Sequence, residues 1–81
     1  MNWYKIAKSK RKWENVDSSF IRSISYNDSL KVLSVKLLGD KVWNYKDVPK
    51  YMYENMLKAE SQGKYFNKYI KDNFNYTRGG K

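Results

Sequence analysis

Three short β-type segments separated by very short turns constrain the fold of this chain more than any other feature. Residues 20–26, 32–38 and 41–46 are rich in Val, Ile, Leu, Trp and Tyr, which is typical of strands. Asn27-Asp28-Ser29 separates the first two segments, and Gly39-Asp40 separates the second from the third. Turns this short join antiparallel neighbours, so we expect a three-stranded antiparallel meander.

Two helices are expected after the meander. Val48-Pro49 opens the first, because Pro is favoured in a first helical turn and Asp47 can cap it. Ser61-Gln62-Gly63 ends that helix. A second helix, from about residue 64 to residue 74, carries apolar side chains on one face. Its other face carries a stripe of lysines: Lys64, Lys68 and Lys71.

These elements predict an α+β fold, in which two consecutive helices pack on one face of the meander. Residues 1–16 are expected to form a basic, aromatic leader, residues 17–76 the folded domain and residues 77–81 a flexible tail. The expected core consists of Ile21, Leu33, Val35, Leu37, Met52, Met56, Leu57, Phe66 and Ile70.

The net charge of +9 is concentrated at the two ends of the chain. Residues 1–13 contain five cations and no acid, and residues 58–81 contain six cations against Glu60 and Asp72. Two basic segments around a neutral middle indicate a surface directed at an anionic partner.

The composition excludes several classes of site. The chain has no Cys and no His, so disulfides, thiolate metal sites and Ser-His or Cys-His nucleophilic pairs are ruled out. Its eight acidic residues are scattered without the spacing of a nuclease, so we expect no enzyme activity and no cofactor. No apolar run approaches the roughly 20 residues that span a bilayer, which favours a soluble cytoplasmic protein.

The orientation of two rings decides whether the sheet offers a stacking surface. A two-residue turn at Gly39-Asp40 places Trp43 and Tyr45 opposite the aliphatic core, edged by Lys36 and Lys41. A three-residue loop shifts the register by one and puts both rings in the core. We favour the two-residue turn, which predicts an exposed platform of the kind that single-stranded RNA readers use.

An ordered series of residues resembles the KTSC domain family, a small module named for the C-terminus of some lysyl-tRNA synthetases. Its strongest part is the run Ala59-x-Ser61-x-Gly63-x-Tyr65-Phe66-Asn67-x-x-Ile70-Lys71. Earlier positions also follow the family pattern: Ser18-Ser19, Ile21, Tyr26, Leu33, Val35, Leu37 and Val48-Pro49. The family's central Tyr-x-Tyr is here Trp43-Asn44-Tyr45. The resemblance covers about residues 17–76 and implies a small domain found in bacteria and their phages, for which RNA binding has been suggested.

From the charge and the rings we expect a non-catalytic nucleic-acid-binding module of low sequence specificity, with RNA preferred over DNA. Cations would hold phosphates while rings stack on bases. The expected contact residues are Lys8, Lys10, Arg11, Lys12, Lys36, Lys41, Trp43, Tyr45, Lys64, Tyr65, Asn67, Lys68, Lys71 and Arg78.

Ser61, Gly63 and Asn67 have both a structural and a functional interpretation. In the structural one, Ser61 caps the second helix, Gly63 allows a close approach and Asn67 ties the helix to the hairpin. In the functional one, Ser61, Gly63 and Lys64 surround a phosphate pocket. We favour the structural interpretation.

Two alternatives remain open. The chain could instead be a small oligomeric phage-type protein, formed from identical copies, that sequesters an anionic nucleotide signal or inhibits a host protein. The basic leader could also lie on a membrane surface with Trp3 and Trp13 inserted.

Overall fold

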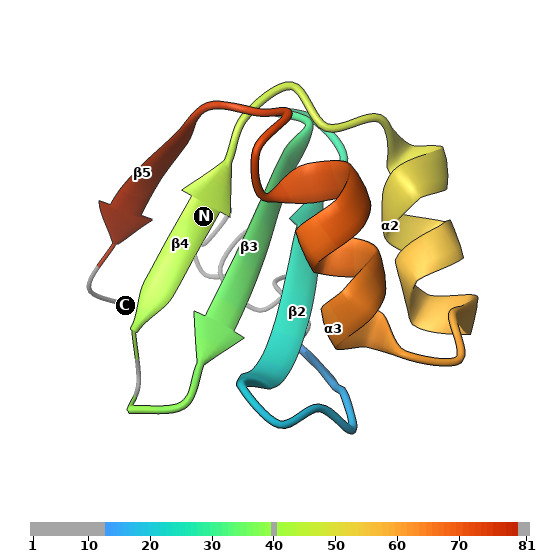
Figure 1. Ribbon diagram of the computed structural model, residues 1–81. Helices are drawn as coiled ribbons and strands as arrows, with labels where there is room; N and C mark the ends of the chain where they lie inside the picture. Colours follow the sequence, from blue (N-terminus) through green and yellow to red (C-terminus); the bar gives the residue numbers. More distant parts are fainter. Residues whose placement is uncertain (1–12, 40, 80–81) are drawn as a thin grey trace, which may run out of the picture.

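The computed structural model describes residues 13–39 and 41–79, which form an α+β domain (Figure 1). Its sheet has five antiparallel strands in the order β1-β2-β3-β4-β5, each paired with the next along the chain. The strands are β1 (Glu14–Asn15), β2 (Ile21–Asn27), β3 (Val32–Leu37), β4 (Val42–Tyr45) and β5 (Tyr76–Gly79). The predicted meander corresponds to β2, β3 and β4, and one strand extends the sheet on each side.

The two outer strands were missed by the sequence analysis. Strand β1 pairs with β2 within the segment that was expected to be a leader. Strand β5 pairs with β4 and includes residues 77–79, so a flexible tail from residue 77 is wrong for these residues. The outer strands have few apolar residues. They form because their backbones hydrogen-bond to the edge strands of the central meander, β2 and β4.

Both helical segments lie on the same face of the sheet, as predicted (Figure 1). Helix α2 (Lys50–Lys58) is followed by α3 (Gln62–Tyr65), which continues directly into the π-helical segment η1 (Phe66–Ile70). The expected helix over residues 64–74 is therefore shorter, and its second half is wound more loosely.

The starts of the two helices differ in how they are capped. Ser61 caps α3, because its hydroxyl accepts a hydrogen bond from the Lys64 amide at 3.2 Å. Helix α2 follows Pro49 and has no side-chain cap. Asp47 was expected to cap it, but Asp47 instead adopts a φ of 59° in the turn before the helix. Asp tolerates this left-handed conformation better than most residues.

Helix α2 is attached to the sheet through Tyr26 of β2. The Tyr26 hydroxyl donates a hydrogen bond to the Val48 carbonyl at 2.6 Å. Its ring stacks on that of Tyr53, with ring centroids 5.3 Å apart and an interplanar angle of 15°. These contacts hold the entry to α2 against one end of the sheet.

The loop between β3 and β4 has three residues, not two. The Leu37 amide donates to the Lys41 carbonyl at 2.7 Å, which leaves residues 38–40 as the loop. Gly39 has a φ of 85°, a left-handed conformation common in three-residue hairpin loops. The predicted two-residue turn is therefore wrong.

This loop sets the register of β4 and the side of the sheet to which its rings belong. Trp43 pairs with Val35, and Tyr45 pairs with Leu33. Because directly paired residues share a face, both rings lie on the aliphatic face that the helices cover. The predicted platform on the opposite face does not form.

The core lies between this face and the helices. Six predicted core residues are buried, and Leu37, Met52 and Leu57 pack against them while partly exposed. Ile24, Tyr45 and Val48 are fully buried core residues that the prediction omitted.

Candidate nucleic-acid interface

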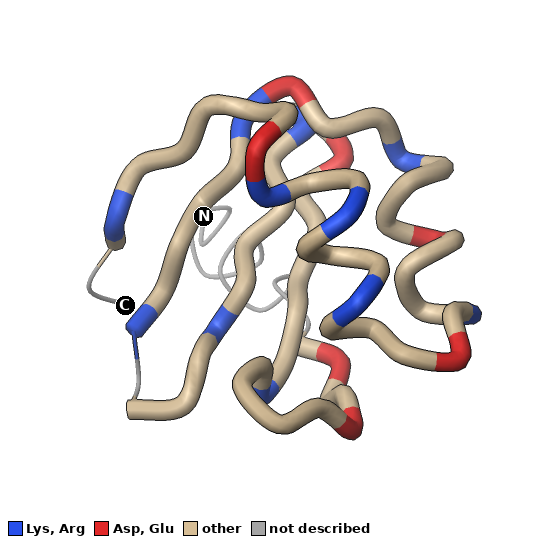
Figure 2. The backbone as a smooth tube through the Cα atoms, viewed as in Figure 1, with Lys and Arg blue, Asp and Glu red and all other residues tan. Residues whose placement is uncertain are grey.

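Three lysines lie along the helical segment that covers the sheet. They are Lys64 in α3, Lys68 in η1 and Lys71 directly after it, and all three are exposed. Figure 2 marks the Lys and Arg positions along this segment in blue. Within residues 13–39 and 41–79 the one ion pair joins Lys50 Nζ to Asp28, at 3.4 Å, so no carboxylate neutralises these three lysines. Their positive charge is available to an anionic partner.

Two tyrosines accompany these lysines. The rings of Tyr65 and Tyr69 are 4.6 Å apart between centroids, with an interplanar angle of 43°. Tyr65 is half-buried, whereas Tyr69 is 40% exposed. Lys68 Nζ lies 5.2 Å from the Tyr69 ring centroid, in cation–π contact. The helical surface therefore combines cations with one exposed ring.

A second group of rings lies on β4 and β5. The Tyr76 ring centroid is 5.1 Å from that of Trp43 and 5.1 Å from that of Tyr45, at interplanar angles of 30° and 32°. Tyr45 is fully buried, Trp43 is half-buried and Tyr76 is 41% exposed. Among these three residues, Tyr76 therefore has the largest exposed fraction.

The burial of Tyr45 removes it from the expected contact residues. Its ring packs edge-on against Phe66 at 5.4 Å, and it has 0% exposure, so no base can stack on it. Desolvation raises the pKa of its hydroxyl to about 12, with Tyr76 and Asp72 contributing. Within the described chain this hydroxyl has no hydrogen-bond partner.

Lys36 and Lys41 do not edge a common platform. Lys36 pairs with Val42 and lies on the face opposite Trp43, where its Nζ is 4.7 Å from the Trp13 ring centroid. The expected position of Lys36 beside the rings is therefore wrong. Lys41 is exposed at the start of β4.

Arg78 lies beside the rings of β4 and β5. It pairs directly with Trp43 across the two strands, which places both side chains on one face. Arg78 is exposed and makes no ion pair within the described residues. The alternation of Tyr76 and Arg78 around Thr77 was a sequence signal for this strand, but it is too short to stand out.

The Ser61, Gly63 and Lys64 group has a structural role. A Cβ at Gly63 would lie 2.9 Å from Phe20 Cε1 and 3.0 Å from Ser18 Oγ, so the backbone packs tightly there. Gly63 is buried, and the Ser61 hydroxyl accepts a hydrogen bond from the Lys64 amide, which supports the structural interpretation of this group. Asn67 is exposed and forms no side-chain bond to the hairpin within the described chain.

Four expected contact residues in the basic leader lie outside the described residues. They are Lys8, Lys10, Arg11 and Lys12.

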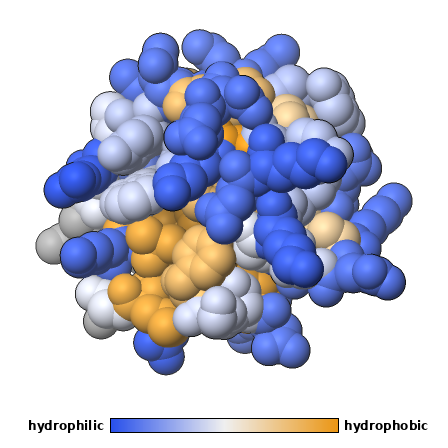
Figure 3. Space-filling model, in the orientation of Figure 1, coloured by the Kyte–Doolittle hydropathy of each residue, from blue (hydrophilic) through white to orange (hydrophobic). Residues whose placement is uncertain are grey.

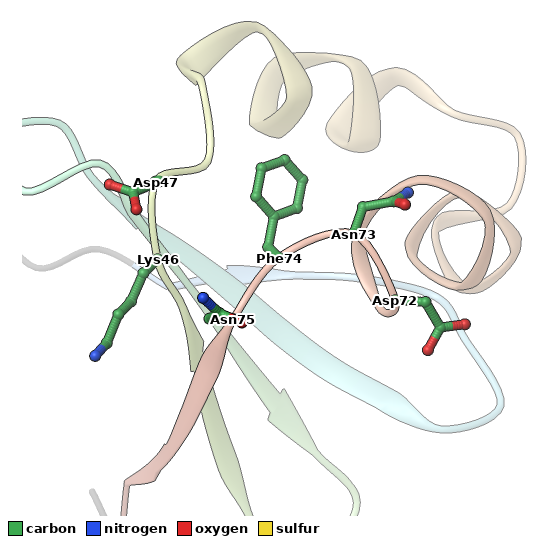
Figure 4. A pocket seen from close by; sticks show the side chains of 6 residues that line it. All are labelled: Lys46, Asp47, Asp72, Asn73, Phe74 and Asn75. Carbon is green, nitrogen blue, oxygen red and sulfur yellow. The ribbon is translucent and has the colours of Figure 1, made fainter.

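A shallow pocket of about 340 Å³ lies where the turn after β4 meets the turn before β5. Its acidic side chains, Asp47 and Asp72, point away from each other, while Phe74 fills the space between the two turns (Figure 4). The polar groups therefore do not converge on one ligand atom. Over residues 13–39 and 41–79, no three acidic side chains are grouped to hold a metal, and no helix is long and apolar enough to cross a membrane.

Exposed apolar side chains gather near the β3–β4 loop. Figure 3 shows the largest group of apolar atoms at the lower left of the helix-bearing face, with smaller apolar areas at the top and right among hydrophilic side chains. Leu38, in the loop, is 53% exposed. The open part of this face therefore combines apolar and aromatic surface with the nearby cations Lys41 and Arg78.

Proteins with related sequences fall into two size classes. A lysine–tRNA ligase of Trichormus variabilis is 33% identical over 62 residues, which cover 76% of this chain and 11% of the ligase. The chain therefore spans about a tenth of the length of the ligases it matches. An uncharacterized protein of Stutzerimonas stutzeri is 30% identical over 64 residues, which cover 78% of this chain and 90% of that protein.

A solved structure has the same fold. The crystal structure of a KTSC domain protein from Yersinia pestis superposes with a TM-score of 0.81 at 29% identity, covering 85% of this chain and 97% of that one. Residues 17–74 match the KTSC domain, in agreement with the resemblance found in the sequence. The chain therefore belongs to the KTSC domain family.

Proposed function

We propose that this domain is a non-catalytic nucleic-acid-binding module that prefers RNA to DNA and has low sequence specificity. The observation that carries the proposal is the row of exposed, unneutralised lysines on the helical segment, Lys64, Lys68 and Lys71. Lysines in such a row contact phosphates as point charges, which gives affinity without base recognition.

The comparisons support RNA over DNA as the partner. Lysine–tRNA ligases, whose name states that they act on a tRNA, contain a region related to this chain. The cationic helical segment of this chain would bind the phosphate backbone of such a partner. The exposed ring of Tyr69, beside Lys68, adds a surface for an unpaired base.

Fluorescence anisotropy with a labelled single-stranded RNA of about a dozen nucleotides tests the proposal. Each neutralised phosphate contributes about 0.7 to the slope of log K against log salt on single strands. The double variant Lys64→Gln/Lys68→Gln should therefore lower that slope by about 1.4 and weaken binding at low salt.

The double variant Lys50→Gln/Lys58→Gln is the matched control, because it removes the same charge from exposed positions on α2. Its affinity should stay close to that of the wild type. Equal losses of RNA affinity in the two variants would show that binding depends on the net charge of the protein and not on the positions of Lys64 and Lys68. RNA binding that does not weaken between about 50 and about 200 mM salt would rule out the phosphate contacts.

A further inference from the structure

The rings on β4 and β5 form a stack that runs from the core to solvent. Tyr45 is its buried member, and Tyr76 is its most exposed member, at 41%. The ring centroid of Tyr76 lies 5.1 Å from the ring centroids of both Trp43 and Tyr45, at interplanar angles of 30° and 32°. Two neighbours therefore hold the Tyr76 ring while much of its surface stays open.

Other exposed tyrosines lack this combination. Tyr51 is 61% exposed but makes no ring contact within the described residues, so nothing aromatic fixes its orientation. Tyr69 is 40% exposed and contacts one ring, that of Tyr65 at 4.6 Å, whereas Tyr76 contacts two rings. A ring that is already held loses less conformational entropy when a flat ligand stacks on it, which favours Tyr76.

A cation lies next to this ring on the same face. Arg78 is two residues from Tyr76 in β5, and alternate residues of a strand share a face about 7 Å apart. Arg78 is exposed and forms no ion pair within the described part of the chain. A nucleotide offers both groups that this face could bind: a flat base, which could stack on Tyr76, and an anionic phosphate, which could pair with Arg78.

We propose that Tyr76 and Arg78 form a site for one unpaired nucleotide, whose base stacks on Tyr76 and whose phosphate pairs with Arg78. The site rests on the proposed nucleic-acid function and specifies the partner as single-stranded. Paired bases in a duplex are already stacked on both faces and offer only their phosphates to such a site. Tyr76 and Arg78 lie on β5, whereas Lys64, Lys68 and Lys71 lie on or directly after α3 and η1.

The test compares a labelled single-stranded RNA with a duplex of the same sequence. Tyr76→Leu keeps an apolar side chain against Tyr45 but removes the ring, and should weaken single-strand binding about 10-fold with little effect on the duplex. Tyr76→Phe should bind like the wild type. Tyr51→Leu is the matched control and should also leave the affinity unchanged.

Arg78→Gln gives an independent measurement at an exposed position that does not pack in the core. It should lower the salt slope on the single strand by about 0.7. Unchanged single-strand affinity in both Tyr76→Leu and Arg78→Gln would overturn this site, while the lysine interface could still stand. A wild type that binds neither RNA at low salt would reject the proposed function and this site together.

Discussion

The helix-bearing face of the sheet is built differently on its two halves. On the covered half, β2 and β3 present aliphatic side chains such as Ile24, Leu33 and Val35, all with 0% exposure. On the open half, β4 and β5 present Trp43, which is half-buried, and Tyr76, which is 41% exposed. The covered half resembles an ordinary protein core, and the open half resembles a binding surface.

The position of the helical segment explains this difference. Phe66 and Ile70 of η1 are buried in the core with Leu33 and Val35, whereas no helix lies in front of β5 in Figure 1. Aliphatic side chains gain stability in proportion to the apolar area that they bury. Tyr and Trp tolerate partial exposure because they combine an apolar ring with a polar group. The strands of the open half can therefore lack a covering helix, because their partly exposed side chains are aromatic and not aliphatic.

The largest expected difference between the halves is in stability. Phe66→Ala removes a buried ring that contacts Tyr45 and Phe20, and should lower the free energy of unfolding by about 3–5 kcal/mol. Tyr76→Ala should cost about 1 kcal/mol, because this ring is partly exposed and buries less of its surface than Phe66 does. Urea unfolding of both variants measures the two losses.

Phe66→Leu provides a milder version in case Phe66→Ala does not fold, since it leaves a smaller cavity. Tyr51→Ala is the exposed control and should change the unfolding free energy by less than about 0.5 kcal/mol. If Tyr76→Ala lowers the free energy of unfolding as much as Phe66→Ala does, both halves belong to the core, and the proposed difference between them is wrong.

The second prediction concerns the contact that places α3 on the covered half. Gly63→Ala brings a Cβ to 2.9 Å from Phe20 Cε1 and should lower stability by about 1–2 kcal/mol. Helix propensity alone predicts the opposite sign, a gain of about 1 kcal/mol. The sign of the change in urea midpoint therefore distinguishes close packing from a loose contact.

A double-mutant cycle with Phe20→Ala gives the control. If the Phe20 ring causes the loss, Gly63→Ala should cost less in the Phe20→Ala background than in the wild type. A stabilised Gly63→Ala, or a cost that does not depend on Phe20, would show that α3 is not held by this contact.

The covered half was largely predictable from the sequence, because its side chains alternate at strand spacing and recur at helical spacing. Ile21, Leu33, Val35, Phe66 and Ile70 were all expected in the core and are buried. These positions depend on local periodicity, which survives small errors in element boundaries. Most positions that carry the family resemblance also lie on this half and in the run through α3 and η1.

The open half was not predictable in the same way. Its orientation depends on the length of one loop, and a single residue more or fewer moves Trp43 and Tyr45 to the other face. Nothing in Gly39-Asp40 distinguishes a two-residue from a three-residue loop. Strand β5 has four residues and no aliphatic side chain, so its pairing depends on the free edge of β4.

The third prediction tests Tyr45, which lies at the boundary between the halves. Its hydroxyl is buried without a hydrogen-bond partner in the described chain, and such a group costs free energy relative to its hydration in the unfolded state. Tyr45→Phe should therefore leave stability at neutral pH unchanged or raise it by up to about 1 kcal/mol. A loss of more than about 1 kcal/mol would mean that the hydroxyl makes a stabilising contact.

The same variant should alter the dependence of stability on pH. Burial raises the pKa of Tyr45 to about 12 in the folded protein, above its ordinary value of 10.0. The native state then holds this proton more tightly than the unfolded state does. The protonated hydroxyl therefore contributes fully to the free energy of unfolding below pH 10, and this contribution is lost as pH rises toward 12. Urea unfolding between these values should show a steeper loss for the wild type than for Tyr45→Phe. Parallel curves would mean that the hydroxyl titrates as freely as an exposed one, which would contradict the burial of Tyr45 in the core.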